Sequence, residues 1–207
     1  MDAWVPQVLA CWRRGQELSA VGPGAVERHL EHARALAGHL APEETVGLDL
    51  GTGAGVPGLA LAGFRPDMRW ILLDAAKRRV DVVQATIDAL GWGDRVEAIH
   101  GRAEDRALIA ARSADVVVAR LFGPPSATAE CAAPLVRAGG RVLVTEPPPT
   151  PSEENQTVRW SERGLEPLGL ALGRRFEQPI VQELVAVGSP EGRFPRKPGV
   201  AVRRPLW

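Results

Sequence analysis

The sequence predicts an α/β fold, with a mostly parallel sheet and helices on both of its faces. From residue 45 onward, short apolar runs alternate with amphipathic segments through about 100 residues, which is the pattern of repeated strand–helix units. A glycine-rich turn joins the first apolar run to the helix that follows it. After the prolines at positions 147–149 and 151, a last strand has no crossover helix before it, so we expect an antiparallel C-terminal strand in a closing hairpin.

The expected elements follow in order along the chain. A helix is expected at 25–40, where apolar side chains share one face. Strands with right-handed crossovers are expected at 45–50, 69–74, 95–100, 115–119, 141–145 and 178–187. Further helices are expected at 56–64, 77–90, 104–111 and 127–137. The prolines of 147–151 indicate an extended connection. We therefore expect an N-terminal helical extension over 1–43, a cofactor-binding domain over 44–190 and a basic C-terminal tail over 191–207.

Composition limits the classes of partner. Lysine and arginine number 25, as do aspartate and glutamate, so any affinity for nucleic acid must come from a local patch. There is neither an apolar run of about 18 residues nor a signal-peptide pattern. Cys11 and Cys131 lie far apart and suggest neither a disulfide framework nor a metal site. We expect a cytoplasmic protein without membrane contact or metal; the sequence leaves the oligomeric state open, with a monomer favoured. His29 and His32 leave a metal pair open, with surface or interhelical histidines as the default.

The strongest functional signal is the turn at residues 51–58. Glycines at 51, 53 and 55 let the backbone turn sharply and approach a ligand without intervening Cβ atoms. Two cofactors fit this spacing. Gly53-x-Gly55-x-x-Gly58, with Asp74 about 20 residues further on, matches the dinucleotide fingerprint. Asp49-x-Gly51-x-Gly53-x-Gly55 matches the S-adenosylmethionine (SAM) fingerprint of class I methyltransferases.

Asp49 favours SAM over a dinucleotide. The anionic pyrophosphate of a dinucleotide would lie at this turn and be repelled by the carboxylate, whereas SAM carries a sulfonium and an ammonium that a carboxylate attracts. The predicted fold is therefore the Rossmann-like fold of class I SAM-dependent methyltransferases. Asp49, Gly51, Gly53 and Gly55 are its first expected cofactor contacts. A glycine-rich turn without a ligand is the remaining alternative.

Three further candidates follow predicted strand ends, where ligands bind in sheets of this class. Asp74 ends the second strand and can accept hydrogen bonds from both ribose hydroxyls, or it can cap the next helix. Glu104, after Ala103, follows the third strand and can contact adenine, or it can serve as an acid in the first turn of a helix. Arg120 follows the fourth strand, where a cation is costly unless it is paired or functional.

The C-terminal tail carries cations interrupted by prolines, with aromatic residues nearby. Such a segment can follow RNA phosphates and stack on a base. A disordered, solubilising tail has a similar composition, so composition favours neither interpretation. The expected RNA contacts are Arg193, Arg196, Lys197, Arg203 and Arg204.

Taken together, these motifs resemble the bacterial small-subunit ribosomal RNA guanine-N7 methyltransferases, the glucose-inhibited division protein B family. The matching segments extend over nearly the whole chain: 18–20, 27–30, 49–58, 72–74, 77–78, 102–104, 119–120 and 193–199. The resemblance implies SAM as cofactor, ribosomal RNA or the small subunit as partner, and guanine N7 as methyl acceptor. The cofactor contacts that it implies are Gly51, Val56, Ala103, Glu104 and Arg120. Arg120 is the candidate for orienting the cofactor or base in catalysis.

The chain also departs from the family pattern. The family usually has asparagine where Glu17 stands and a Lys-Gly pair where this chain has Glu146-Pro147, and its N-terminal helical region is longer. A carboxylate at position 146 near an RNA-facing loop would repel phosphate. Two other functions therefore stay open: a SAM-dependent enzyme with a small-molecule substrate, and a non-catalytic cofactor-binding paralogue.

Overall fold

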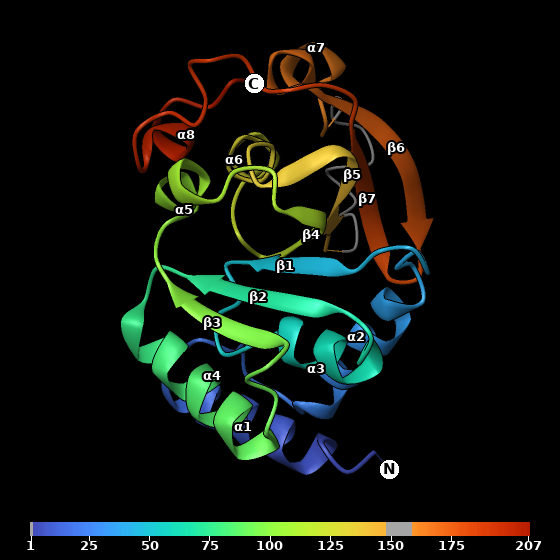
Figure 1. Cartoon of the computed structure of the whole chain (residues 1–207), viewed down its shortest axis with the longest axis vertical. Helices are drawn as coiled ribbons and strands as arrows, with labels where there is room; N and C mark the ends of the chain where they lie inside the picture. The colour runs from blue at the N-terminus through green and yellow to red at the C-terminus, as the bar shows by residue number, and fades with distance from the viewer. Residues whose placement is uncertain (1, 148–158) are drawn as a thin grey trace. The chain divides into compact units, whose positions relative to one another are not determined.

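A computed structural model describes residues 2–147 and 159–207 (Figure 1). The chain divides into two compact units, residues 1–102 and 103–207. Within the described residues, no helix has the length and apolar character to cross a membrane.

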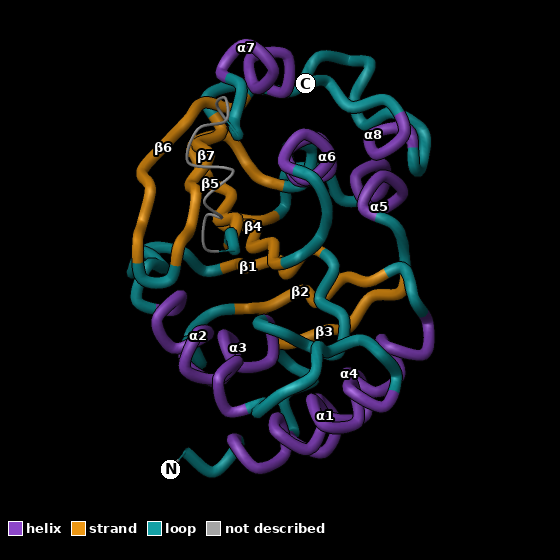
Figure 2. The backbone as a smooth tube through the Cα atoms, turned by 180° about the vertical axis from the view of Figure 1, so that it is seen from behind, coloured by secondary structure: helices purple, strands orange, loops and turns teal. Residues whose placement is uncertain are grey.

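The first unit places four helices against three parallel strands. The strand order is β3 (Val96–His100), β2 (Arg69–Asp74), β1 (Val46–Leu50). The helices lie together on one face of these strands (Figures 1 and 2). They are α1 (Val5–Glu17), α2 (Glu27–Ala37), α3 (Gly58–Phe64) and α4 (Lys77–Leu90).

The sequence pattern explains most of these elements. Strands β1 and β2 are almost continuously buried, in agreement with their largely apolar sequences. Helix α4 has the predicted bounds and ends at Gly91, which adopts the left-handed conformation at φ 66°. Helix α1 lies within the expected N-terminal helical extension, but its bounds were not predicted, although Val5, Val8 and Trp12 have helical spacing and are all buried.

The second unit contains the rest of the sheet pattern. Its strands lie in the order β4 (Ala114–Arg120), β5 (Val136–Thr145), β7 (Ile180–Ala186), β6 (Leu170–Glu177). Strand β5 is parallel to β4, and β7 runs antiparallel to both β5 and β6. The expected antiparallel C-terminal strand in a mostly parallel sheet is therefore confirmed as β7, which lies between β5 and the edge strand β6. The helices are α5 (Ala103–Ile109), α6 (Pro125–Ala132), α7 (Glu162–Leu165), a 3-10 turn (Glu166–Leu168) and α8 (Val200–Arg203).

One expected helix has the wrong C-terminal boundary. The predicted helix 127–137 ends as α6 at Ala132, and residues from Val136 onward belong to β5. Pro134 has no backbone N–H to continue the helical ladder, so the helix stops before it. The bounds of β6, α7 and α8 were not expected at all. The predicted extended connection over 147–151 lies, apart from Pro147, outside the described residues.

Candidate cofactor site

The glycine turn between β1 and α3 has the backbone that its sequence predicts. Gly51, Gly53 and Gly55 have φ angles of 73°, 60° and 86°, in the left-handed region that residues with a Cβ rarely adopt. The turn is fixed to the next strand, because the N–H groups of Gly51 and Thr52 both donate to the Leu73 carbonyl, at 2.9 and 3.0 Å. Three glycines thus allow the left-handed backbone of this turn, and at Gly55 a Cβ would also lie 2.4 Å from the Leu59 side chain.

Asp49 braces this turn from inside. Its side chain is fully buried, and Oδ2 accepts hydrogen bonds from Thr52 Oγ1 at 2.6 Å and from the Gly58 N–H at 2.8 Å. A Cβ at position 58 would lie 2.6 Å from Oδ2 and 2.4 Å from Leu72, so only glycine fits there. The acid singled out by the sequence therefore holds both ends of the turn with its carboxyl group. Contact of Asp49 with a cofactor stays a prediction.

Asp74 holds the middle of the turn. Its carboxylate is 7 % exposed, with Oδ2 accepting from the Gly53 N–H at 2.9 Å and Oδ1 from the Ala76 N–H at 2.8 Å. Ala76 is the N-cap residue of α4. Asp74 therefore binds the N–H of the N-cap residue and not one in the first turn of the helix, so Asp74 is not its capping residue. A carboxylate accepts about four hydrogen bonds, which leaves capacity for ribose hydroxyls.

Helix α1 supports the same turn through contacts that the sequence analysis missed. Cys11 Sγ donates to the Ala54 carbonyl at 3.3 Å, and Trp12 Nε1 donates to the Gly55 carbonyl at 3.1 Å. Gly15 lets the helix approach closely, because a Cβ there would lie 2.3 Å from that of Ala54. Burial raises the pKa of the Cys11 thiol, so it stays protonated and can donate. The helical spacing of apolar residues in 5–12 was the available signal.

We predict that Trp12→Phe weakens SAM binding although Trp12 is fully buried behind the turn. The substitution removes the donor to the Gly55 carbonyl and leaves a small cavity, at a cost of about 1–3 kcal/mol. Calorimetric titration with SAM measures the effect. Trp92→Phe, at a half-buried tryptophan that stacks with Arg95, is the matched control and should bind SAM as the unmodified chain does. Equal affinity of both variants would contradict the supporting role of Trp12.

In the second unit, two of the predicted cofactor residues start helix α5. Ala103 is 5 % exposed and Glu104 is 9 % exposed. Glu104 Oε1 accepts a hydrogen bond from the Gly199 N–H at 3.0 Å. Arg120 is the last residue of β4 and half-buried, followed by Leu121 with a φ of 53°. Each of these residues lies at an element end, as expected, and their cofactor contacts stay predictions.

The basic tail is folded, and its five cations differ in their surroundings. Arg196 pairs with Glu130 through two contacts, one of them Nε to Oε1 at 2.7 Å, and is mostly buried. Arg193 pairs with Glu191 at 2.9 Å and lies 5.0 Å from the centre of the Phe194 ring. The others are exposed: Lys197, Arg203 and Arg204.

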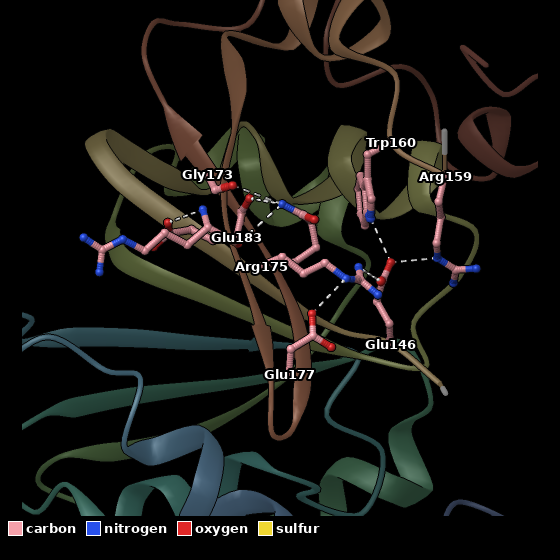
Figure 3. Close-up of polar contacts among 9 residues, drawn as sticks. Glu146, Arg159, Trp160, Gly173, Arg175, Glu177 and Glu183 are labelled. Carbon is pink, nitrogen blue, oxygen red and sulfur yellow. Dashed lines mark hydrogen bonds and ion pairs between the residues drawn. The ribbon is translucent and has the colours of Figure 1, made fainter. Parts of the chain in front are cut away.

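Glu146 does not present the repulsive charge that the sequence suggested. Its side chain is 2 % exposed, and Oε1 accepts from Arg159 Nε and Trp160 Nε1, both at 2.7 Å (Figure 3). Oε2 pairs with Arg175, which also lies 3.7 Å from Glu177. Two guanidinium groups therefore neutralise the carboxylate. The expectation of repulsion toward phosphate was wrong, because the partners lie 13 and 29 residues further along the chain.

Glu17 and His29, which the sequence also singled out, contact other side chains of the protein. Glu17 is exposed and forms an ion pair with Arg14 on the same helix. The His29 ring packs edge-on against Trp12, with ring centres 6.1 Å apart. In residues 2–147 and 159–207, no three histidine, cysteine, aspartate or glutamate side chains form a group that could hold a metal ion. Both cysteines are free and buried.

Comparisons with known proteins agree with this geometry. The GidB family model, described as rRNA small subunit methyltransferase G, matches residues 20–157. A protein of that name from Mycobacterium marinum is 33% identical over 183 residues, covering 83% of this chain and 77% of the relative. One from Kineococcus radiotolerans is 33% identical over 201 residues, covering 92% and 78%.

Solved structures show the same fold. A crystal structure of the S-adenosylmethionine-dependent methyltransferase SibL superposes with a TM-score of 0.56 and 20% identity. It covers 77% of this chain, which spans 55% of that structure's length. The predicted class I SAM-dependent methyltransferase fold is confirmed. This chain belongs to the GidB family, the family of rRNA small subunit methyltransferase G.

Proposed function

We propose that this protein transfers the methyl group of SAM to N7 of a guanine in small-subunit (16S) ribosomal RNA, in the cytoplasm. The observation that carries the proposal is the turn held by Asp49 and Asp74, in a chain of the rRNA small subunit methyltransferase G family. The fully buried Asp49 is better suited to the sulfonium and ammonium of SAM than to a pyrophosphate. This charge preference favours SAM over a dinucleotide.

The residues present fit SAM. Gly51, Gly53 and Gly55 give the turn the left-handed backbone that the fingerprint requires, and Asp74 has acceptor capacity for ribose hydroxyls. Glu104 offers a second carboxylate oxygen, Oε2, that makes no hydrogen bond within the described part of the chain. When bound, SAM supplies an electrophilic methyl group on its sulfonium.

The proposed acceptor explains why binding residues suffice. Guanine N7 carries an in-plane lone pair, so no proton has to be removed before methyl transfer and no general base is required. The contribution of this chain is then to hold its two reactants in line, an effect that supplies about 7–11 kcal/mol in well-oriented systems. Arg120, at the end of β4, is proposed to orient the cofactor or the base.

We propose that RNA is bound in part by a basic face formed by Lys197, Arg203 and Arg204. All three are exposed, and no hydrogen bond or ion pair involving their side chains is present among the described residues. Arg196 is excluded from this face because its guanidinium is committed to Glu130. Arg193 is exposed, but it forms an ion pair with Glu191 that reduces its attraction for phosphate. A local face of this kind is what a chain of zero net charge needs to bind RNA.

Neutralising Lys197 and Arg203 together should flatten the salt dependence of RNA binding. Removing one phosphate contact reduces the log–log slope by about 0.7 for single strands, so removing two reduces it by roughly 1.4. Binding to a 16S RNA fragment at several salt concentrations measures the slope. The matched control replaces Arg163 and Arg174, two exposed arginines elsewhere in the second unit, and should keep the slope. An unchanged slope in the first variant would remove these residues from the interface.

Methyl transfer itself tests the proposed function. Purified protein is incubated with labelled SAM and either small ribosomal subunits or naked 16S RNA lacking its own modifications. Incorporation into one guanine, found as 7-methylguanosine after digestion, is the expected result. SAM binding without transfer to RNA would instead favour a small-molecule acceptor or a non-catalytic paralogue.

A further inference from the structure

The C-terminal segment, defined here as residues 193–207, is part of the packed second unit. Phe194 is 7 % exposed and Ala201 3 % exposed, and α8 packs against α6. Leu206 N–H donates to Ser126 Oγ at 2.8 Å. The Trp207 ring lies against Gly164, where an added Cβ would be 2.1 Å away. The segment is thus fixed along its whole length and lies beside α5 and α6 (Figures 1 and 2).

The strongest anchor of this segment is the pair between Arg196 and Glu130. Glu130 lies on α6 with its side chain 3 % exposed, and both of its oxygens contact the guanidinium. Removing one partner of a buried pair leaves an uncompensated charge, which is strongly destabilising. The neighbouring Cys131 is also shielded from water. Its burial, together with the charges of Glu104 and Glu130, raises the pKa of its thiol to about 12. Arg196 is therefore held in place by the Glu130 carboxylate, which is almost completely shielded from water.

Three residues after this anchor, the segment contacts a predicted cofactor residue. The Gly199 N–H donates to Glu104 Oε1 at 3.0 Å, and Gly199 has a φ of 77°, which favours glycine. Glu104 is nine-tenths buried, and Oε2 makes no hydrogen bond within the described residues. The contact fixes one oxygen of the carboxylate and leaves the other available to a ligand.

We infer that Arg196 and Gly199 are positioning residues for the cofactor, acting through Glu104. Arg196 anchors the segment on Glu130, and the anchored Gly199 N–H orients the Glu104 carboxylate so that Oε2 can accept a hydrogen bond from the adenine amine. This inference rests on the proposed SAM-dependent function. It assigns the basic tail a second role: its innermost cation serves the cofactor site, while its exposed cations are left for RNA.

Anchoring of the C-terminal segment and binding of the adenosyl group must favour each other. If the anchored segment raises the affinity for the adenosyl group, then binding of that group must stabilise the anchored segment by the same factor. S-adenosylhomocysteine is a suitable probe because it carries the adenosyl group and cannot react. Its binding should slow hydrogen exchange of the Gly199 amide. The Gly164 amide, which donates to Ser161 Oγ at 3.1 Å in α7, is the internal control and should not change.

The second arm of the experiment uses variants of the full chain. Arg196→Met is expected to weaken binding of S-adenosylhomocysteine by roughly tenfold, the lower range for loss of an interaction with a charged group. Arg174→Met, at an exposed arginine on β6, is the matched control and should bind as the unmodified chain does.

The outcomes separate this inference from the proposed function. Slower exchange at Gly199, with weaker binding by Arg196→Met, supports the positioning role. If Arg196→Met does not fold, the exchange measurement on the unmodified chain decides alone. Binding of S-adenosylhomocysteine without any change at Gly199 would overturn the positioning role only. Absence of measurable binding to the unmodified chain would overturn the proposed function as well.

Discussion

Replacing Gly53 with valine is expected to abolish SAM binding while the chain stays folded. Gly53 has a φ of 60°, a conformation in which a β-branched residue is strained by about 1–3 kcal/mol. Its N–H is held by Asp74 at 2.9 Å, and a Cβ at this position would lie 3.2 Å from the Ala20 carbonyl oxygen. The added side chain would strain the turn and crowd the Ala20 carbonyl, and so displace the backbone at which the cofactor is proposed to bind.

Calorimetric titration with SAM measures this loss, and circular dichroism verifies the fold. Gly91→Val is the matched control, because Gly91 has nearly the same φ, 66°, and open space around its Cβ position at the end of α4. We expect that control to lose a similar amount of stability and to retain its SAM affinity. A folded Gly53→Val protein with unchanged SAM affinity would show that the glycine turn is not the cofactor site.

Replacing Glu146 with alanine is expected to destabilise the chain by about 2 kcal/mol. The variant leaves the buried Trp160 Nε1 without its acceptor and removes the common partner of Arg159 and Arg175. Both arginines are more than 40 % exposed, so water can solvate their guanidinium groups once the carboxylate is removed. The loss of stability is therefore smaller than for a fully buried ion pair.

Urea unfolding measures this change in the free energy of unfolding. The matched control is Glu177→Ala, which removes a 75 % exposed carboxylate that lies 3.7 Å from the same Arg175. That control is expected to change stability by less than about 0.5 kcal/mol. If Glu146→Ala were equally harmless, Glu146 would not be a structural anchor, and a role on the RNA-facing surface would have to be reconsidered.

Local sequence signals predicted the parts of the fold that depend on them. The amphipathic segment 77–90 was predicted with the bounds of α4, and the structure buries Val80, Val83 and Ile87 of it and ends it at Gly91. Strands β1 and β2 followed from short, largely apolar runs. Helix 127–137 was predicted too long because its apolar composition continues into β5, and only Pro134 marks the boundary.

The residue types of the candidate site were also predictable, but their partners were not. Asp49 and Asp74 stand at strand ends, which a parallel sheet brings to one edge. The donor that Trp12 supplies to Gly55 comes from 43 residues away, and no local pattern encodes it. Glu146 illustrates the same limit, since its charge is visible in the sequence and its neutralisation by Arg175 is not.

Nucleoside analysis of ribosomal RNA tests the central claim most directly. 16S RNA is isolated from the native host and from a strain that lacks this protein, digested, and examined by mass spectrometry. We expect one guanine to carry 7-methylguanosine in the host and to be unmodified in the deletion strain, with restoration by the unmodified chain and not by Gly53→Val. Identical 7-methylguanosine content in the two strains would contradict the proposed function.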